Sequence, residues 1–218
     1  MLRFSLPPDL RRILVLGAHS DDIEIGVGGT LLSLIEANPE LEIYWAVFSA
    51  PGVRKAEAFE SASEYLAPLK FSKIEISSFR ESYFPTEWHD IKSHLEKVKA
   101  GFEPDLVFTH FREDRHQDHR VLSDLAWNTF RNHLLLEYEI LKYDGDLGHP
   151  NLFFPLSERI ASRKIELLLK HFKSQATSKH WFSSDSFSAL HRIRGIEIAT
   201  TYAEAFYARK IPLGNGRS

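Results

Sequence analysis

The chain has 218 residues, of which 43% are hydrophobic, a formal net charge of -3 and no cysteine. Its length and composition are sufficient for one buried core, so we expect a single domain over residues 1–218. The mixed charges give no electrostatic reason to expect nucleic acid or an acidic membrane as a partner, and a small-molecule substrate fits better. The lack of cysteine excludes disulfides, cysteine-ligated zinc and a cysteine nucleophile.

The beginning of the sequence carries no recognisable export signal. Residues 1–12 lack both a continuous apolar segment and a small-residue cleavage site. No apolar run in the sequence reaches the roughly 20 residues that a membrane-spanning helix needs. We therefore expect no transmembrane segment and a cytoplasmic location, while the oligomeric state stays open.

Strands and helices alternate along the chain. Residues 13–16 are a short apolar run, which is typical of a strand that is buried on both faces. The glycine-rich residues 26–30 predict a flexible approach to a helix that carries Leu31 and ends near Asn38. The later predicted elements are strand 43–48, helix 54–66, strand 71–77, helix 90–100, strand 106–109, helix 121–135, strand 138–143 and helix 157–173.

This alternation predicts an α/β fold, namely a single Rossmann-like domain with a mostly parallel sheet flanked by helices. Parallel strands are normally joined by a crossover helix, which explains the order of the elements. Residues 144–154 contain glycine and proline and are predicted to form a long surface loop that borders the site. The rest of the C-terminal part is expected to be helical or irregular.

Two clusters of imidazoles and carboxylates follow predicted strands. Residues 18–22 read Ala-His-Ser-Asp-Asp directly after the first strand, and residues 116–119 read His-Gln-Asp-His shortly after strand 106–109. Because the carboxyl ends of parallel strands meet at one rim of a sheet, both clusters can reach a common crevice. So many ionisable groups near a core edge are costly to desolvate without a metal or a partner. The pattern predicts a mononuclear metal hydrolase.

Three of these side chains make a plausible ligand set. Hydrolytic zinc sites typically combine three protein ligands with one water, whose pKa the ion lowers to roughly 7. His19, Asp22 and His119 are the predicted ligands, and Asp21 is the predicted general base that takes the proton from that water. Zinc is the expected ion, although these ligands also suit another divalent ion such as Fe²⁺.

The second cluster supplies two further catalytic candidates. As an imidazolium, His116 is expected to stabilise the oxyanion of a tetrahedral intermediate or to give a proton to the departing amine. Asp118 is expected to hold His116 in the orientation that this needs.

The motifs resemble those of the LmbE and PIG-L family of metal-dependent N-acetylglucosaminyl deacetylases. Residues 18–24 are similar to the family's Ala-His-Pro-Asp-Asp-x-Glu motif, and residues 116–119 to its His-x-Asp-His motif. Residues 28–30 read Gly-Gly-Thr after the first motif. Residues 54–58 resemble the family's Arg-x-x-Glu-Ala helix start, and residues 171–175 resemble its His-x-Ser-Gln segment.

The resemblance implies a Rossmann-like fold, zinc in the site, and hydrolysis of the acetamide of N-acetylglucosamine-type substrates. It places the metal ligands, the base and the stabilising histidine on the residues named above, and it suggests Arg54 as a contact to sugar or phosphate. Ser20 stands where the family usually has proline, which loosens the turn, but we expect activity to survive. Arg80 and Glu81 stand where an acidic substrate contact is expected, so the substrate is left open.

The leading hypothesis is a zinc-dependent amidohydrolase that removes acetate from an N-acetylated sugar or glycoconjugate through attack of a metal-bound water. Two alternatives stay open. One is a metal-dependent hydrolase of a different amide or an ester, and the other is a sugar-binding relative that has lost catalysis.

Overall fold

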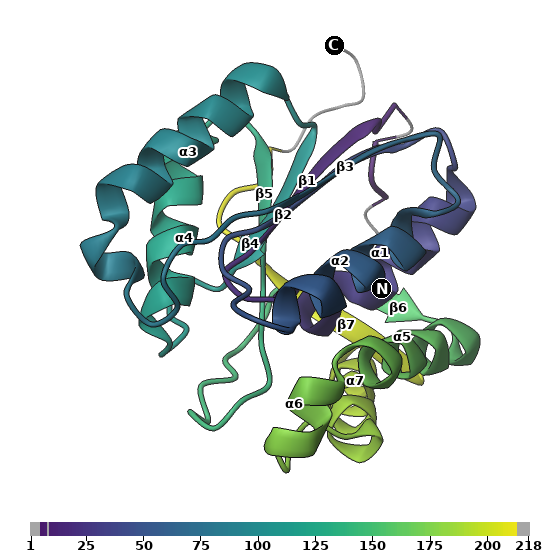
Figure 1. Cartoon of the computed structure of the whole chain (residues 1–218). Helices are drawn as coiled ribbons and strands as arrows, with labels where there is room; N and C mark the ends of the chain where they lie inside the picture. The colour runs from purple at the N-terminus through teal and green to yellow at the C-terminus, as the bar shows by residue number, and fades with distance from the viewer. Residues whose placement is uncertain (1–4, 8, 213–218) are drawn as a thin grey trace.

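The strands of the protein form one mixed sheet, which Figure 1 shows between two groups of helices. The computed structural model describes residues 5–7 and 9–212. Part of the export prediction, on residues 1–4 and 8, therefore lies outside the described residues. Within the described chain the strand order is β3-β2-β1-β4-β5-β7-β6. The strands are β1 (Arg12–Gly17), β2 (Glu42–Val47), β3 (Phe71–Ile76), β4 (Leu106–His110), β5 (Leu134–Tyr138), β6 (Leu152–Leu156) and β7 (Tyr202–Ala208).

The helices cover both faces of this sheet. Helices α3 and α4 pack on one face and α1 and α2 on the other, where α5 packs against α1 and α2 (Figure 1). The helices are α1 (Asp22–Ala37), α2 (Arg54–Leu66), the short 3-10 helix η1 (Phe84–Thr86), α3 (Trp88–Gly101), α4 (Gln117–Thr129), α5 (Glu158–His171), α6 (Lys173–Ser178) and α7 (Ser184–Glu197). No helix in the described part of the chain combines the length and apolar character that crossing a bilayer requires.

The sheet is parallel where the site forms. Strands β1 to β5 run parallel, and β7 is antiparallel to both β5 and β6. The predicted α/β fold with a mostly parallel sheet is therefore confirmed. The chain moves outward from β1 through β2 to β3 on one side, and from β4 to β5 on the other. The neighbours β1 and β4 thus mark the point where the strand order reverses, and ligands of open α/β sheets bind beyond the strand ends there.

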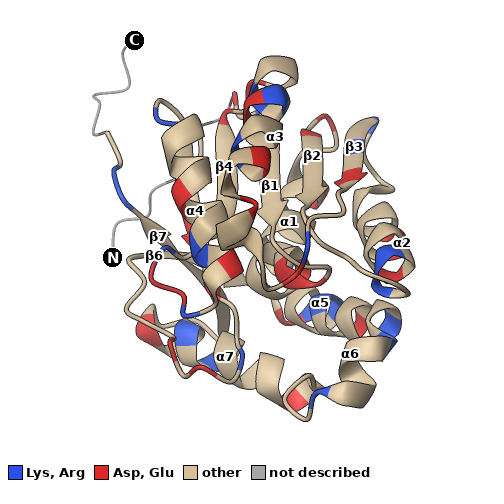
Figure 2. Ribbon diagram, turned by 60° about the vertical axis from the view of Figure 1, so that its left-hand side comes forward, with Lys and Arg blue, Asp and Glu red and all other residues tan. Residues whose placement is uncertain are grey.

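Strand β1 is buried on both faces, as its unbroken apolar run predicts. Ile13 and Val15 contribute to the core under α1, whereas Leu14 and Leu16 contribute to the core under α3 and α4. Figure 2 marks the charged residues along the ribbon and shows both signs interspersed over the helices and loops.

The glycine-rich segment after β1 is helical, so the predicted flexible approach is wrong. Helix α1 already begins at Asp22 and includes these glycines. Close packing explains their presence, because a Cβ atom on Gly26 would lie 2.1 Å from the ring of Tyr138. A Cβ atom on Gly28 would lie 2.7 Å from the hydroxyl oxygen of Tyr65. The glycines let the helix lie directly against the sheet and against α2.

Two boundaries in the second half were also predicted wrongly. The helix predicted at 121–135 ends at Thr129, and the strand predicted at 138–143 is β5, Leu134–Tyr138. A short buried apolar run fits a helix and a strand equally well, which explains the shift. Residues 152–156, partly predicted as loop, form β6. Strand β7 was not predicted because the buried charged Glu204 obscures its apolar alternation.

Candidate active site

The turn after β1 places the first cluster over the carboxyl end of the sheet. The carboxylate of Asp22, the first residue of α1, accepts a hydrogen bond from the backbone N–H of His19 at 2.6 Å. The N–H of Ala18 donates to Nε2 of His110, the last residue of β4, at 2.9 Å. These bonds fix the turn against the neighbouring strand. The second cluster comes from the start of α4, which follows β4.

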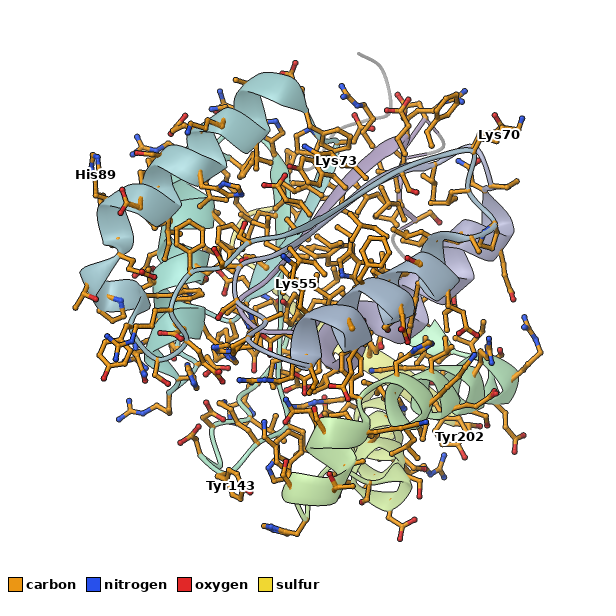
Figure 3. The ribbon with its side chains drawn as sticks, viewed as in Figure 1. Lys55, Lys70, Lys73, His89, Tyr143 and Tyr202 are labelled. Carbon is orange, nitrogen blue, oxygen red and sulfur yellow. The ribbon has the colours of Figure 1, made fainter. Side chains whose placement is uncertain are left out.

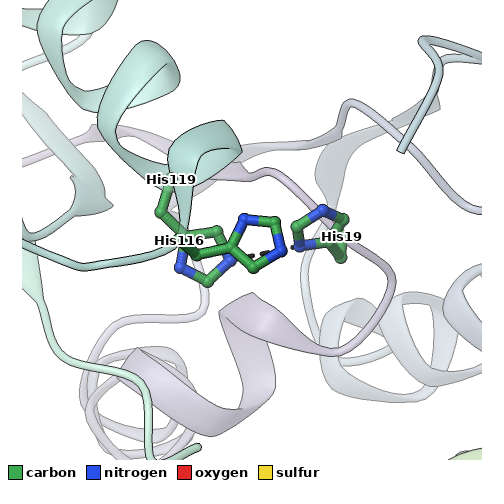
Figure 4. Close-up of side chains that lie close together, drawn as sticks. All are labelled: His19, His116 and His119. Atoms are coloured by element: carbon green, nitrogen blue, oxygen red, sulfur yellow. Dashed lines mark hydrogen bonds between the residues drawn. The ribbon is translucent and has the colours of Figure 1, made fainter. Parts of the chain in front are cut away.

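Three donor atoms from the two clusters converge on one point. Nδ1 of His19 lies 3.1 Å from Nε2 of His119 and 3.4 Å from Oδ2 of Asp22. Nε2 of His119 lies 3.5 Å from that same carboxylate oxygen. Ligand atoms about 2.1 Å from a tetrahedral ion lie roughly 3.4 Å apart, so these spacings fit a divalent metal ion. Figure 4 shows His19 facing His119 across this point, with His116 beside them.

The outer nitrogens of both rings are bound to carboxylates. Nε2 of His19 lies 3.1 Å from Oδ2 of Asp118, and Nδ1 of His119 lies 2.9 Å from Oδ2 of Asp114. A carboxylate attracts the single proton of a neutral imidazole to the nitrogen that faces it, which leaves a lone pair on the inner nitrogen. When both rings are neutral, two imidazole lone pairs and a carboxylate oxygen therefore point at each other, an arrangement that a cation stabilises.

The environments of His19 and His119 shift their pKa values in opposite directions. Burial opposes a charge on His19, but the carboxylates of Asp22 and Asp118 outweigh it and raise the pKa of His19 to about 10. Burial and the neighbouring His110 lower the pKa of His119 to about 3. The proton on His19 thus offsets the buried Asp22 carboxylate, and a bound divalent ion would take over that task.

Asp21 has the environment of a general base. Its side chain is buried and lines the same pocket as the three donor residues. Burial and, next, the adjacent Asp22 carboxylate raise the pKa of Asp21 to about 6. A carboxylate with a pKa near neutrality accepts protons more readily than an exposed one. Ser20, which stands in the place of the family proline, donates its hydroxyl to Oδ1 of Asp21 at 3.4 Å.

His116 caps helix α4 with its own ring. Its Nδ1 accepts the backbone N–H of Asp118 at 3.2 Å, so the proton of the neutral ring lies on Nε2. Its ring centroid is 4.8 Å from that of His19 and 4.6 Å from that of His119. Burial and the charge of His19 lower the pKa of His116. This environment favours a neutral hydrogen-bond donor over the imidazolium that the sequence suggested.

The expected role of Asp118 is corrected by its contacts. Its side chain does not orient His116, because it is only the backbone of Asp118 that meets that ring. The carboxylate instead binds Nε2 of His19 and accepts the backbone N–H of Ser82 at 2.6 Å and of Phe84 at 3.1 Å. Asp118 therefore orients His19 and holds the loop after β3 against the site.

His110, a fully buried residue at the end of β4, was not predicted from the sequence. Its Nε2 lies 3.2 Å from Oδ2 of Asp22, and its ring stacks on that of His119 with centroids 3.9 Å apart. His19, His116 and His119 form one group able to hold a metal ion, and Asp22, His110 and His119 form another. The signal was a histidine directly after the apolar run 106–109, at the same rim as the predicted ligands.

A pocket of about 220 Å³ opens beside the donor atoms. Arg54 lines it, but its guanidinium is engaged in a two-pronged ion pair with Glu81, whose Oε1 lies 2.9 Å from one nitrogen. Tyr143 and Trp181 bring aromatic rings to its lining. The lining residues are His19, Asp21, Asp22, Ile25, Arg54, Glu81, His116, His119, Ile140, Lys142, Tyr143, Asp144, Lys179 and Trp181.

The segment after α5 closes one side of this pocket. Glu57 of α2 accepts the N–H of Ser174 at 2.9 Å and its hydroxyl at 2.5 Å, which anchors α6 near Arg54. Residues that follow α6, Lys179 and Trp181, then reach the pocket. Sequence patterns gave no indication of either. In Figure 3 Tyr143 lies on the loop between β5 and β6, on the same side of the molecule as α6.

A comparison with known protein families shows to which family this protein belongs. The family PIG-L, described as GlcNAc-PI de-N-acetylase, matches residues 14–130, which is more than half of the chain. This protein belongs to the PIG-L family. The resemblance predicted from the motifs is therefore confirmed.

Solved structures of the same fold share little sequence with this PIG-L protein. N,N'-diacetylchitobiose deacetylase from Pyrococcus horikoshii has a TM-score of 0.72 at 20% identity, over 91% of this chain and 83% of that one. Teicoplanin deacetylase Orf2, in its zinc-inhibited form, has a TM-score of 0.68 at 17% identity, with 90% and 97% covered. GalB, the 4-carboxy-2-hydroxymuconate hydratase from Pseudomonas putida KT2440, has 0.74 at 15% identity, with 96% and 100% covered. At these identities the likeness shows the fold.

Proposed function

We propose that this PIG-L protein is a metal-dependent N-deacetylase that hydrolyses the acetamide of an N-acetylated amino sugar to acetate and the free amine. The observation that carries the proposal is the convergence of Nδ1 of His19, Oδ2 of Asp22 and Nε2 of His119 beside the buried carboxylate of Asp21. The family assignment supports the reaction type. Zinc is the favoured ion, since two imidazoles and one carboxylate are a common catalytic zinc set.

The residues around this point have distinct roles in the proposed hydrolysis of the amide. A divalent ion held by His19, Asp22 and His119 would supply Lewis-acid chemistry that activates water and polarises the acetamide carbonyl. Asp21 takes one proton from the attacking water as the new C–O bond forms. Nε2–H of His116 donates a hydrogen bond to the carbonyl oxygen as this oxygen gains negative charge. Asp21 then returns its proton to the nitrogen as the C–N bond breaks, which yields acetate and the amine.

The pocket favours a small substrate. Its volume of about 220 Å³ lies below the ~300–1,000 Å³ of pockets for drug-sized ligands, so a single sugar ring fits better than a long chain. Tyr143 and Trp181 offer aromatic faces to such a ring, and Arg54 and Lys179 offer donors to its hydroxyl or acidic substituents. Arg54 thus stays the proposed substrate contact, with Glu81 holding it in place.

An acetate-release assay on the metal-loaded protein tests the proposal. The panel pairs N-acetylglucosamine with its methyl glycoside, its 1-phosphate and its nucleotide conjugate, and adds an N-acetylated amino acid and an aryl acetate. We expect acetate and amine in equal amounts from at least one sugar, and their loss after chelation. Metal content is measured on the same sample. Turnover of the amino acid or the ester alone would establish a different hydrolase, and tight sugar binding without acetate would establish a binding protein.

A further inference from the structure

A row of buried ionisable side chains with alternating charges extends from the candidate ligand His119 into the wall of the pocket. Asp114 binds Nδ1 of His119 through one carboxylate oxygen at 2.9 Å. Its other oxygen lies 3.1 Å from Nζ of Lys142 and accepts the backbone N–H of His116 at 2.8 Å. Lys142 also binds Asp146, whose carboxylate accepts the N–H of Arg115 at 2.7 Å. We call this row of four side chains, which consists of His119, Asp114, Lys142 and Asp146, the relay.

The relay is built into the protein interior. The side chains of Lys142 and Asp146 are each 8% exposed and that of Asp114 is 2% exposed. A lysine so deeply buried needs carboxylate partners to offset the loss of hydration, and Asp114 and Asp146 are nearer to it than Asp144, at 3.9 Å. Its position between them is fixed by this requirement. Lys142 also belongs to the loop between β5 and β6 that carries Tyr143 and Asp144, two lining residues of the pocket.

The contacts of Asp114 explain what the lysine does for His119. The carboxylate of Asp114 is buried and lies between Nδ1 of His119 and Nζ of Lys142, so the ammonium group of Lys142 offsets the loss of hydration of this carboxylate. An ionised Asp114 keeps the proton of His119 on Nδ1 and leaves the lone pair on Nε2, where the proposed ion binds. Without the lysine, Asp114 would be a buried carboxylate that has lost its ammonium partner.

We propose that Lys142 is a positioning residue that couples the metal-binding geometry of His119 to the loop between β5 and β6. The proposal rests on the metal site of the proposed function. Coupling between two sites is reciprocal, so metal binding must hold this loop more firmly, and disruption of the loop must weaken metal binding. The pocket wall that meets the substrate is then completed when the ion is present.

Zinc affinity and amide hydrogen exchange of the full chain test the coupling. Lys142→Met keeps the length of the side chain and removes its charge, whereas Lys142→Arg keeps the charge. We expect Lys142→Met to weaken zinc binding about 10- to 100-fold, the range for partners of metal ligands, and Lys142→Arg to recover part of the loss. In the parent, zinc should slow exchange of residues 139–151, and in Lys142→Met this protection should disappear.

Lys179→Met is the matched control. Lys179 lines the same pocket but lies over the ring of Trp181, at 5.2 Å from its centroid, outside the relay. Its loss should leave the zinc affinity within twofold of the parent. Asp146→Asn provides a second variant that disturbs only the far end of the relay, and exchange in β1 and β4 verifies folding in each case.

The outcomes separate the two proposals. A zinc affinity of Lys142→Met within twofold of the parent, or exchange of residues 139–151 that zinc does not change, would overturn the coupling. If zinc binds, the relay behaves as expected and no acetate is released from any sugar, the coupling stands and the proposed deacetylase activity fails.

Discussion

Nδ1 of His19 lies 3.1 Å from Nε2 of His119, although the two residues are 100 positions apart in the sequence. Each ring presents its outer nitrogen to a carboxylate, so the two inner nitrogens can approach this closely only with a proton or a cation between them. With its pKa raised to about 10, His19 carries such a proton at pH 7.

Zinc binding should therefore release about one proton per ion at pH 7, since the ligand nitrogen must be deprotonated. Because the pKa of His19 lies above this pH, the zinc affinity should rise as the pH increases from 6 to 9. Calorimetric titrations in buffers of different ionisation enthalpy measure the number of protons released. His19→Ala should bind zinc far more weakly. A proton release of zero would show that His19 is already neutral before the ion binds.

Replacement of Asp21 by asparagine should separate catalysis from metal binding. The amide cannot take a proton from water, so kcat should fall by about 10²- to 10⁴-fold, the usual contribution of a general base. The metal content should stay equal to that of the parent, since Asp21 is not one of the three converging donors. Metal analysis and acetate release on one preparation provide both measurements. An unchanged kcat would exclude Asp21 as the base.

Stability should depend on an ion pair buried beneath helix α1. Nζ of Lys164 lies 2.7 Å from Oε1 of Glu204, and the two side chains are 1% and 3% exposed. Glu204 also accepts the backbone N–H of Gly29 and Thr30 in α1. Removal of one partner from a buried pair costs about 3–5 kcal/mol, so Glu204→Gln should lower the free energy of unfolding by this order.

An exposed pair provides the control for this measurement. Arg159 and Glu36 are 66% and 51% exposed, and such pairs contribute ~0–1 kcal/mol. Urea unfolding of Arg159→Gln should therefore differ little from the parent. Equal losses in Glu204→Gln and Arg159→Gln would argue against a structural role for the buried pair.

The stability should also respond to the protonation of Glu24. This side chain is fully buried, and burial raises the pKa of its carboxyl from 4.5 to about 8. Between these values the folded state holds a proton that the unfolded state releases, so Glu24 makes the free energy of unfolding fall as the pH rises. The slope approaches ~1.4 kcal/mol per pH unit for one proton.

Glu24→Gln removes this contribution and keeps the shape of the side chain. The free energy of unfolding of the variant, relative to the parent, should increase from pH 5 to pH 8. Comparison of the two proteins at each pH cancels the titration of other groups, including His191, whose pKa burial and Lys164 lower to about 2. A difference that stays constant with pH would show that Glu24 is ionised in the folded protein.

Close packing of α1 predicts a strong effect at Gly26. Its added Cβ atom would lie 2.1 Å from the ring of Tyr138, whose hydroxyl donates to the carbonyl of Leu16 at 2.6 Å. Gly26→Ala should lower the free energy of unfolding by about 1–3 kcal/mol or more, as overpacked cores do. Gly101→Ala is the matched control, since nothing lies within 4 Å of its added Cβ. Thermal unfolding of both variants tests this.

The sequence was informative where local patterns determine the geometry. The apolar run of β1 and the cluster that follows it predicted the central strand and the rim at which the donors meet. His19, Asp22 and His119 were predicted to lie close together because one cluster follows a buried strand directly and the other follows a buried strand after a short loop. Helix α1 was placed too late because the glycines read as a loop, whereas it is tertiary packing against Tyr138 that requires them.

Other features depend on contacts between distant segments and leave no local pattern. Asp114 lies just before the second cluster, but its partner Lys142 lies beyond α4 and β5. The role of Asp118 was misassigned because spacing could not show that its carboxylate reaches His19 across the site. A single histidine at a strand end, such as His110, has an ordinary capping interpretation, so its contact with Asp22 could be found only in three dimensions.

The donor atoms and several walls of the pocket come from different stretches of the chain. His19, Asp22 and His119 lie within residues 14–130, the part that matches the family, whereas Tyr143, Lys179 and Trp181 lie beyond it. The proposed metal ligands thus belong to the part of the chain that matches the family, whereas several residues proposed to contact the substrate do not. Divergence in the C-terminal stretch can redirect such an enzyme to a new compound while its reactive centre stays the same.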